Sequence, residues 1–179
     1  MVEHQGLVNL LWSMLDILEM KSSDRMLALT TIGFDIAGLE LYLPLICGAQ
    51  TIIANRVSAK DPALLAGLLE SHKITILQAT PSTWRILTEG GWCGSVGLKA
   101  VCGGEALPVN LAAQICERAD KVFNVYGPTE TTVWSSVQTC TGAETHRAPI
   151  VPIGRPISNT RIYILGGHGQ PARRTGSNR

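Results

Sequence analysis

Hydrophobic side chains follow two spacings along this chain, and together the two spacings predict an α/β fold. Apolar residues three or four positions apart favour helices over residues 1–18, 36–48, 62–69, 81–87 and 108–119. Short apolar runs favour strands over residues 26–29, 50–54, 74–77, 98–102, 121–125 and 134–139. Asp35 is placed to cap the second helix, Asp61–Pro62 opens the third, and residues 78–81 are expected to form a loop.

Strands and helices alternate five times in this prediction, which indicates a layered parallel βαβ sheet with helices on both faces. Ligands of such sheets bind at the carboxyl ends of the strands. Phe34–Asp35, Gln78, Gly103–Gly104 and Tyr126–Gly127 all fall at predicted strand ends. Independent features therefore meet at one edge of the sheet.

Composition narrows the class of protein. Hydrophobic residues make up 45% of the 179 positions and charged residues 16%, as in a folded globular chain. A net charge of +1 gives no electrostatic argument for nucleic acid. No apolar stretch reaches membrane-spanning length and no signal peptide begins the chain, so we expect a cytoplasmic protein without a membrane partner. Five widely spaced cysteines argue against a disulfide framework or a zinc site and are expected to be reduced.

The stretch 124–133 carries the most distinctive chemistry. Gly127 and Pro128 favour a rigid turn after the strand that ends at Val125. The hydroxyls and single carboxylate of residues 129–132 suit a phosphate with its Mg²⁺, which prefers oxygen ligands. Tyr126 offers a ring face to a base, and Asn124 offers an amide to the edge of that base. By chemistry alone a polar loop is the simpler interpretation, because glycine, proline and threonine are common in turns.

The order of these residues resembles a known signature. Tyr126-Gly-Pro-Thr-Glu130 is similar to the signature of adenylate-forming (AMP-binding) enzymes. Asn124 before it and Thr131–Thr132 after it resemble the amino-acid adenylation domains of nonribosomal peptide synthetases. The resemblance covers residues 1–171 and implies part of the large N-terminal domain of such an enzyme, with a last strand within residues 153–165. It implies an ATP-dependent ligase of secondary metabolite biosynthesis that forms aminoacyl-AMP and pyrophosphate.

The resemblance also implies roles for individual residues. Glu130 would hold Mg²⁺ and Thr129 would contact phosphate. His4 joins them as a catalytic candidate because the 2–9 stretch matches the family, although chemistry alone favours a solvated or capping histidine. The nucleotide ATP would be bound by the residues Gly104, Glu105, Asn124, Tyr126, Gly127 and Thr129.

The amino-acid pocket follows from the same resemblance. Asp35 would bind the α-ammonium group, because an unpaired buried charge is costly. The remaining matched positions are Ile36, Leu39, Gln78, Val101, Gly103, Val125, Val133 and Trp134. This set resembles glycine-activating domains, with bulky Gln78 and Trp134 in the space of a side chain. Another small neutral amino acid is the alternative.

Three family parts do not occur in the sequence: the glycine-rich phosphate loop, the ribose-binding aspartate and the C-terminal-domain lysine. We therefore expect an internal fragment that begins at a truncation point and is inactive alone. Residues 172–179 do not resemble the family, and we expect a frameshift, primer or vector tail there. The parent synthetase would supply a carrier domain with phosphopantetheine and a condensation domain. An acyl-CoA or aryl-acid ligase, which needs no Asp35, and a non-catalytic ATP-binding module remain alternatives.

Overall fold

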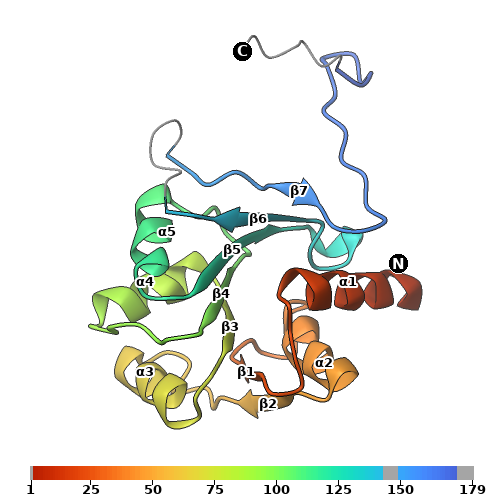
Figure 1. Ribbon diagram of the computed structural model, residues 1–179. Helices are drawn as coiled ribbons and strands as arrows, with labels where there is room; N and C mark the ends of the chain where they lie inside the picture. The colour runs from red at the N-terminus through yellow and green to blue at the C-terminus, as the bar shows by residue number, and fades with distance from the viewer. Residues whose placement is uncertain (1, 143–148, 173–179) are drawn as a thin grey trace.

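The computed structural model of the protein describes residues 2–142 and 149–172. These residues form one mixed sheet that lies between two groups of helices (Figure 1). In the described residues the strand order is β2-β1-β3-β4-β5-β6-β7. The strands are β1 (Arg25–Ala28), β2 (Gln50–Ile53), β3 (Ile76–Ala79), β4 (Lys99–Cys102), β5 (Lys121–Tyr126), β6 (Ser136–Cys140) and β7 (Arg155–Pro156). Strands β1 to β5 are parallel, and β6 and β7 extend the β5 edge in antiparallel fashion.

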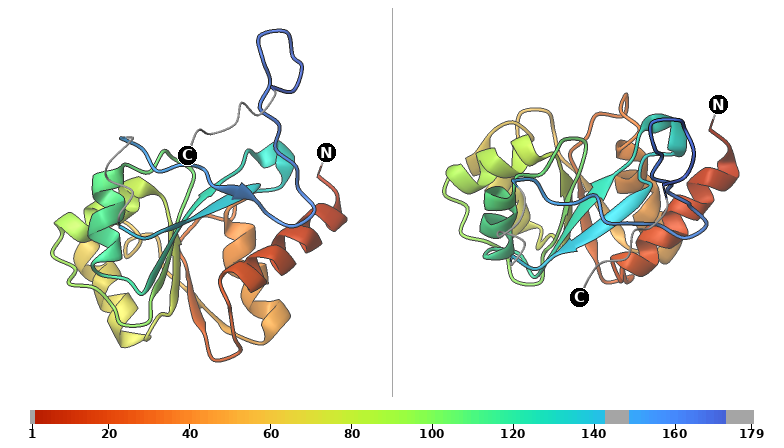
Figure 2. Two further views of the ribbon diagram at one scale, coloured as in Figure 1. Left: turned by 45° about the horizontal axis from the view of Figure 1, so that its top comes forward. Right: turned by 90° about the horizontal axis from the view of Figure 1, so that it is seen from above.

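Helices cover both faces of this sheet, as the hydrophobic pattern predicts. Helices α1 (His4–Ile17) and α2 (Ala37–Cys47) lie on one face. Helices α3 (Pro62–Ser71), α4 (Pro81–Glu89) and α5 (Val109–Cys116) lie on the other, and the turned views in Figure 2 keep the two groups apart. The predicted α/β class is confirmed. None of the helices in the described part of the chain has the length and apolar character needed to cross a bilayer.

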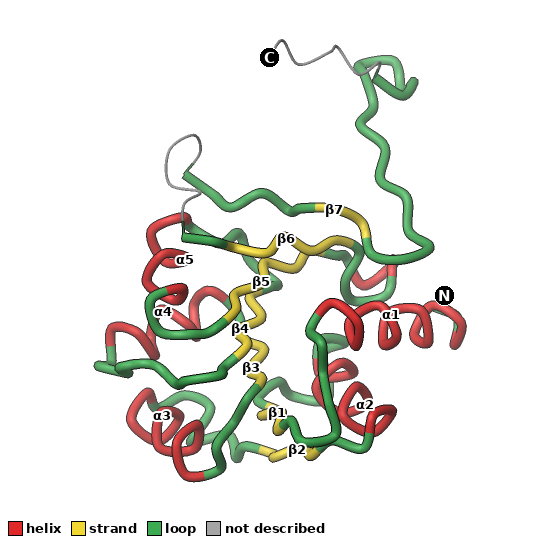
Figure 3. Tube along the Cα trace, in the orientation of Figure 1, coloured by secondary structure: helices red, strands yellow, loops and turns green. Residues whose placement is uncertain are grey.

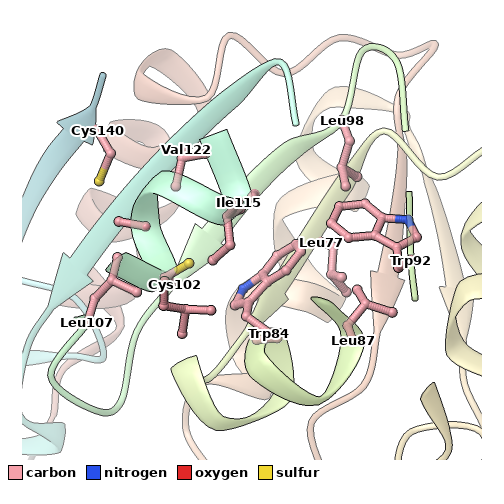
Figure 4. Close-up of a cluster of buried hydrophobic side chains, with 14 of the residues drawn as sticks. Leu77, Trp84, Leu87, Trp92, Leu98, Cys102, Leu107, Ile115, Val122 and Cys140 are labelled. Carbon is pink, nitrogen blue, oxygen red and sulfur yellow. The ribbon is translucent and has the colours of Figure 1, made fainter. Parts of the chain in front are cut away.

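The two cores follow from the alternation of side chains along the strands. Leu27 and Leu77 point into the cluster under α3, α4 and α5, where Trp84 and Trp92 pack 5.8 Å apart (Figure 4). Their neighbours Met26 and Ile76 point into the opposite cluster under α1 and α2. Both faces of the central strands are therefore buried, and polar groups lie at the strand ends.

Local sequence explains where the helices begin. The Asp61 carboxylate accepts hydrogen bonds from the backbone N–H groups of Ala63 and Leu64 and so caps α3, the helix that Asp61–Pro62 was expected to open. The Thr80 hydroxyl accepts from the Thr83 N–H at the start of α4. Proline occupies the first turn of both helices, where its missing N–H costs little.

Some local expectations are wrong. Asp35 does not cap α2, because the turn before the helix already has i to i+3 hydrogen bonds and the N-cap Ile36 has helical rather than extended angles. Gln78 and Ala79 do not form a loop but belong to β3, where Gln78 pairs with Val101. The segment 153–165 contributes only the short β7, after which Figure 3 shows irregular chain leading away from the sheet. Of the expected tail at residues 172–179, all but Ala172 lie outside the described residues.

Two helix glycines give a matched stability prediction. Gly48 ends α2 with φ of 73°, a left-handed angle, whereas a Cβ on Gly67 in α3 would meet nothing within 4 Å. We expect Gly48→Ala to lower the free energy of unfolding by about 1–2 kcal/mol. Gly67→Ala should raise it by about 0.5–1 kcal/mol, because alanine favours the helix. Urea denaturation followed by circular dichroism measures both, and equal effects of the two substitutions would contradict the assigned backbone angles.

Candidate functional site

Two adjoining pockets open at the carboxyl ends of the parallel strands. The first, here called the aspartate pocket, encloses about 480 Å³, and its lining includes Asp35, Gln78, Gly103, Thr129 and Trp134. The second, here called the tyrosine pocket, encloses about 310 Å³, and its lining includes Asn124, Tyr126, Val125 and Ile153. The two pockets meet because both linings include the residues Gly104, Glu105, Gly127 and Trp134.

The lining of the aspartate pocket includes the carboxylate of Asp35. Asp35 lies in the turn between β1 and α2 and is partly exposed. Within the described residues its side chain makes no hydrogen bond or ion pair. Thr30, Phe34 and Ile36 line the pocket beside it. This part of the pocket therefore combines an unpaired acid with the apolar side chains of Phe34 and Ile36.

A buried hydrogen-bond chain forms the inner wall of the same pocket. Glu40 of α2 is fully buried, and its carboxylate accepts from the Gln78 amide, with Nε2 3.0 Å from Oε1. Gln78 Oε1 in turn accepts from the Trp134 indole N–H at 2.9 Å. Burial raises the pKa of Glu40, although hydrogen bonds from Thr30 and Gln78 oppose that rise.

Glu40 is the residue that the sequence prediction missed. It shares a face of α2 with Leu39 and Leu43, which are both fully buried. A lone acid on the apolar stripe of a helix is the signal that could have identified it, because an ionised carboxylate is rarely buried without partners.

The tyrosine pocket combines an exposed aromatic ring with a fixed side-chain amide. Tyr126 is 49% exposed at the end of β5. Buried Asn124 donates its amide N–H groups to the carbonyls of Val151 and Pro152, which fixes the orientation of its side chain. Gly104 has a φ of 84°, a backbone angle that brings the main chain close to both pockets.

A tight turn separates the exposed acid from the buried indole. Glu130 lies exposed in the short helix η1 (Thr129–Thr131). Thr132 and Val133 follow with φ of 69° and 61°, and the backbone N–H of Trp134 donates to the Thr132 carbonyl at 2.7 Å. Positive φ is costly for a β-branched residue. The turn thus directs Glu130 outward and Trp134 inward within a few residues.

The structure separates the predicted pocket residues into groups. Asp35, Ile36, Gln78, Gly103 and Trp134 line the aspartate pocket, and Val125 lines the tyrosine pocket. The aliphatic side chains at the other three matched positions line neither pocket and pack in one buried cluster with Trp134: Leu39, Val101 and Val133.

His4 also lies outside both pockets, exposed in the first turn of α1. That turn nevertheless approaches the segment after η1, because a Cβ on Gly6 would lie 2.8 Å from Thr132 Oγ1.

Comparison with known proteins gives consistent matches. The family described as AMP-binding enzyme matches residues 1–177. The chain is 42% identical over 170 residues to a dimodular nonribosomal peptide synthase of Bacillus subtilis (strain 168), covering 95% of this chain and 7% of that protein. It is 35% identical over 173 residues to tyrocidine synthase 3 of Brevibacillus parabrevis, covering 95% of this chain and 3% of that protein.

Solved structures of similar proteins share the fold. The crystal structure of holo-AB3403, a four-domain nonribosomal peptide synthetase bound to AMP and glycine, matches with a TM-score of 0.88 and 39% identity. That match covers 95% of this chain and 13% of the other. The AMPPNP-bound form of the nonribosomal peptide synthetase FmoA3 matches with a TM-score of 0.84 and 27% identity, covering 95% of this chain and 19% of the other. The chain thus spans a small part of each relative.

Crowding at Gly103 gives a test of the pocket geometry. A Cβ on Gly103 would lie 2.5 Å from Trp134 Cη2 and 2.6 Å from Val125 Cγ2. We expect Gly103→Ala to lower the free energy of unfolding by about 1–3 kcal/mol, because the indole would have to move within a packed core. Gly33→Ala is the matched control, since its Cβ would meet nothing within 4 Å. Urea denaturation compares the two variants, and an unchanged Gly103→Ala stability would show that the indole does not lie against Gly103.

Proposed function

The chain belongs to the AMP-binding enzyme family, and from that premise we propose that it is part of an amino-acid adenylation domain. The reaction joins an amino acid and ATP to form aminoacyl-AMP and pyrophosphate. The observation that carries the proposal is the pair of joined pockets, one with an unpaired carboxylate and the other with an exposed aromatic ring. The two reactants would lie side by side, so that proximity lowers the barrier.

Asp35 supports an amino acid rather than a simple carboxylic acid as the substrate. Its carboxylate lines the aspartate pocket and has no partner among the described residues. An α-ammonium group placed there would form a charge-assisted hydrogen bond. Thr30 and the apolar wall beside it offer no competing cation. A carboxylic acid without an amino group would leave Asp35 unpaired.

The tyrosine pocket fits the adenine of ATP. Tyr126 would stack on one ring face, and Gly104, Glu105 and Gly127 would lie along the nucleotide. Because the Asn124 N–H groups face Val151 and Pro152, its amide oxygen is directed to accept from the adenine amino group. Relatives with bound AMP and AMPPNP support a nucleotide as the ligand.

Residues of the η1 turn would organise the reacting phosphate. The exposed Glu130 carboxylate fits Mg²⁺, which keeps several waters and takes further oxygen ligands from phosphates. Bound Mg²⁺ would neutralise charge that develops on the leaving group. Thr129 lines the aspartate pocket and would donate its hydroxyl to a phosphate oxygen. A substrate carboxylate oxygen would bond to the α-phosphorus while pyrophosphate leaves with the electron pair of the broken P–O bond. His4 is retained as a third catalytic candidate.

Glycine is the substrate that the pocket supports best. Gln78 and Trp134 are each about 1% exposed and hydrogen-bonded to each other across the inner wall. Their bulk occupies the space that an amino-acid side chain would need. The aliphatic residues Leu39, Val101 and Val133 lie in the buried cluster that contains Trp134, so they would act by supporting the wall. The glycine-bound relative supports the assignment.

The relatives are multidomain synthetases, which supports further domains as partners that would accept the aminoacyl group. A carrier domain with a phosphopantetheine thiol would accept the aminoacyl group from AMP, and a condensation domain would use the resulting thioester. These steps require other domains of a cytoplasmic synthetase.

Asp35 gives the sharpest functional test. Residues 1–171 would replace the matching segment of a complete adenylation domain, and amino-acid-dependent ATP–pyrophosphate exchange would be measured. Asp35→Asn should lower kcat/KM for glycine by about 10- to 100-fold, because a charge-assisted hydrogen bond is lost. Asp16→Asn, an exposed position of α1, is the matched control and should leave exchange unchanged. Exchange only with acids that lack an amino group would assign an acyl or aryl-acid ligase. ATP binding without any substrate dependence would indicate a binding module.

The 179-residue chain alone should show little or no exchange. Its sequence contains no glycine-rich phosphate loop, and it lacks counterparts of the family's ribose-binding aspartate and C-terminal lysine. Groups that neutralise the transition state supply much of the rate of such reactions. Exchange by the purified chain at a rate near that of the complete domain would refute this expectation.

A further inference from the structure

We propose that Glu40 is a positioning residue that sets the size of the aspartate pocket by orienting Gln78 and, through Gln78, the indole of Trp134. The substrate part of this inference rests on the proposed function. The hydrogen-bond chain itself does not, and it is open to a separate test. Glu40 touches neither proposed reactant, because it is fully buried and absent from both pocket linings.

The first step is the anchoring of Glu40. Its Oε2 accepts from the backbone N–H groups of Leu29 and Thr30, each at 2.9 Å. Its Oε1 accepts from the Thr30 hydroxyl at 2.7 Å and from Gln78 Nε2 at 3.0 Å. These donors connect α2 to the ends of β1 and β3. The carboxylate therefore has a fixed position and presents Gln78 with an acceptor.

The second step is the orientation of the Gln78 amide. Its two N–H bonds are directed at Glu40 Oε1 and the Ile36 carbonyl, both at 3.0 Å. An ionised carboxylate and a carbonyl can only accept, so the NH₂ group must face them. The amide oxygen then faces the other way, toward Trp134. The reversed amide would set its oxygen against two acceptors.

The third step is the placement of the indole. An indole N–H can only donate, so it pairs with the Gln78 oxygen and not with a reversed NH₂ group. The same ring closes against Gly103, where an added Cβ would meet its Cη2 atom at 2.5 Å. The left-handed angles of Thr132 and Val133 just before Trp134 are costly, and burial of the hydrogen-bonded ring offsets that cost. Loss of the indole hydrogen bond would free the ring to leave the pocket wall.

Glu40→Gln tests this chain of orientation in the complete domain described above. The oxygen of the new amide would stay on the Leu29 and Thr30 N–H groups, so its NH₂ group would oppose Gln78 Nε2. Because the Ile36 carbonyl still accepts from Gln78, the conflict would displace the Gln78 amide rather than reverse it, and its oxygen would move away from the indole N–H. We expect the ratio of kcat/KM for glycine to that for alanine to fall about tenfold, which is the discrimination that one methyl group allows. Glu89→Gln, an exposed change at the end of α4, should leave the ratio unchanged.

Two further measurements separate positioning from general support of the fold. Incorporated 5-fluorotryptophan, assigned through Trp134→Phe, should show a shifted ¹⁹F resonance for Trp134 in Glu40→Gln and no shift in Glu89→Gln. Gln78→Met removes the amide at nearly equal length and should reproduce the loss of glycine selectivity. Adding Glu40→Gln to Gln78→Met should then change the ratio less than twofold, because the two substitutions act along one route.

The outcomes distinguish this inference from the proposed function. Absence of amino-acid-dependent exchange in the unsubstituted domain would refute the function, while the ¹⁹F shift would still decide the role of Glu40. Normal glycine exchange with an unchanged ratio and an unchanged Trp134 resonance in Glu40→Gln would overturn the inference alone. If Glu40→Gln does not fold but folds together with Gln78→Met, the conflict at Gln78 is confirmed. If neither folds, Glu40 is a structural anchor and the inference is wrong.

Discussion

Each central strand of the parallel sheet must bury both of its faces, and this constraint shapes the rest of the molecule. Neighbouring residues such as Met26 and Leu27 enter opposite cores, so helices have to cover both sides. Polar side chains are then concentrated where the strands end. Asp35, Gln78, Gly103 and Tyr126 come from different strand ends, yet they line two joined pockets. The arrangement of the cores thereby determines where a ligand can meet polar groups.

The carboxylate of Glu40 is a polar group that lies within a core rather than at a strand end, and hydrogen bonds compensate for its burial. Glu40 lies on the buried side of α2, where an unpaired carboxylate would be strongly unfavourable. Four donors from Leu29, Thr30 and Gln78 satisfy its oxygens. Such a network is stabilising only when complete, and it fixes its members in one arrangement. The inner wall of the aspartate pocket is therefore held by directed hydrogen bonds as well as by apolar packing.

Sequence patterns predicted most of the helices and parallel strands because each depends on local spacing, and α3 begins at Asp61–Pro62 as the sequence indicated. The strand-end clustering followed from topology. The role of Glu40 could not be predicted from sequence, because its hydrogen bond to Gln78 spans 38 residues and the hydrogen bond between Gln78 and Trp134 spans 56. Asp35 was wrongly expected to cap α2 because sequence cannot reveal that the preceding turn is already tightly hydrogen-bonded. The burial of Leu39, Val101 and Val133 behind the wall likewise depends on tertiary packing.

The hydrogen bond between Gln78 and Trp134 has a consequence for how this pocket changes over evolution. Replacing the indole alone leaves the Gln78 oxygen buried without a donor, and replacing the glutamine alone leaves the indole N–H without an acceptor. Either intermediate is less stable than both the starting and the final pair. The two positions are therefore expected to be exchanged as a unit, so recombination that inherits the whole segment from β3 to β6 is a shorter route to a new pocket than stepwise substitution.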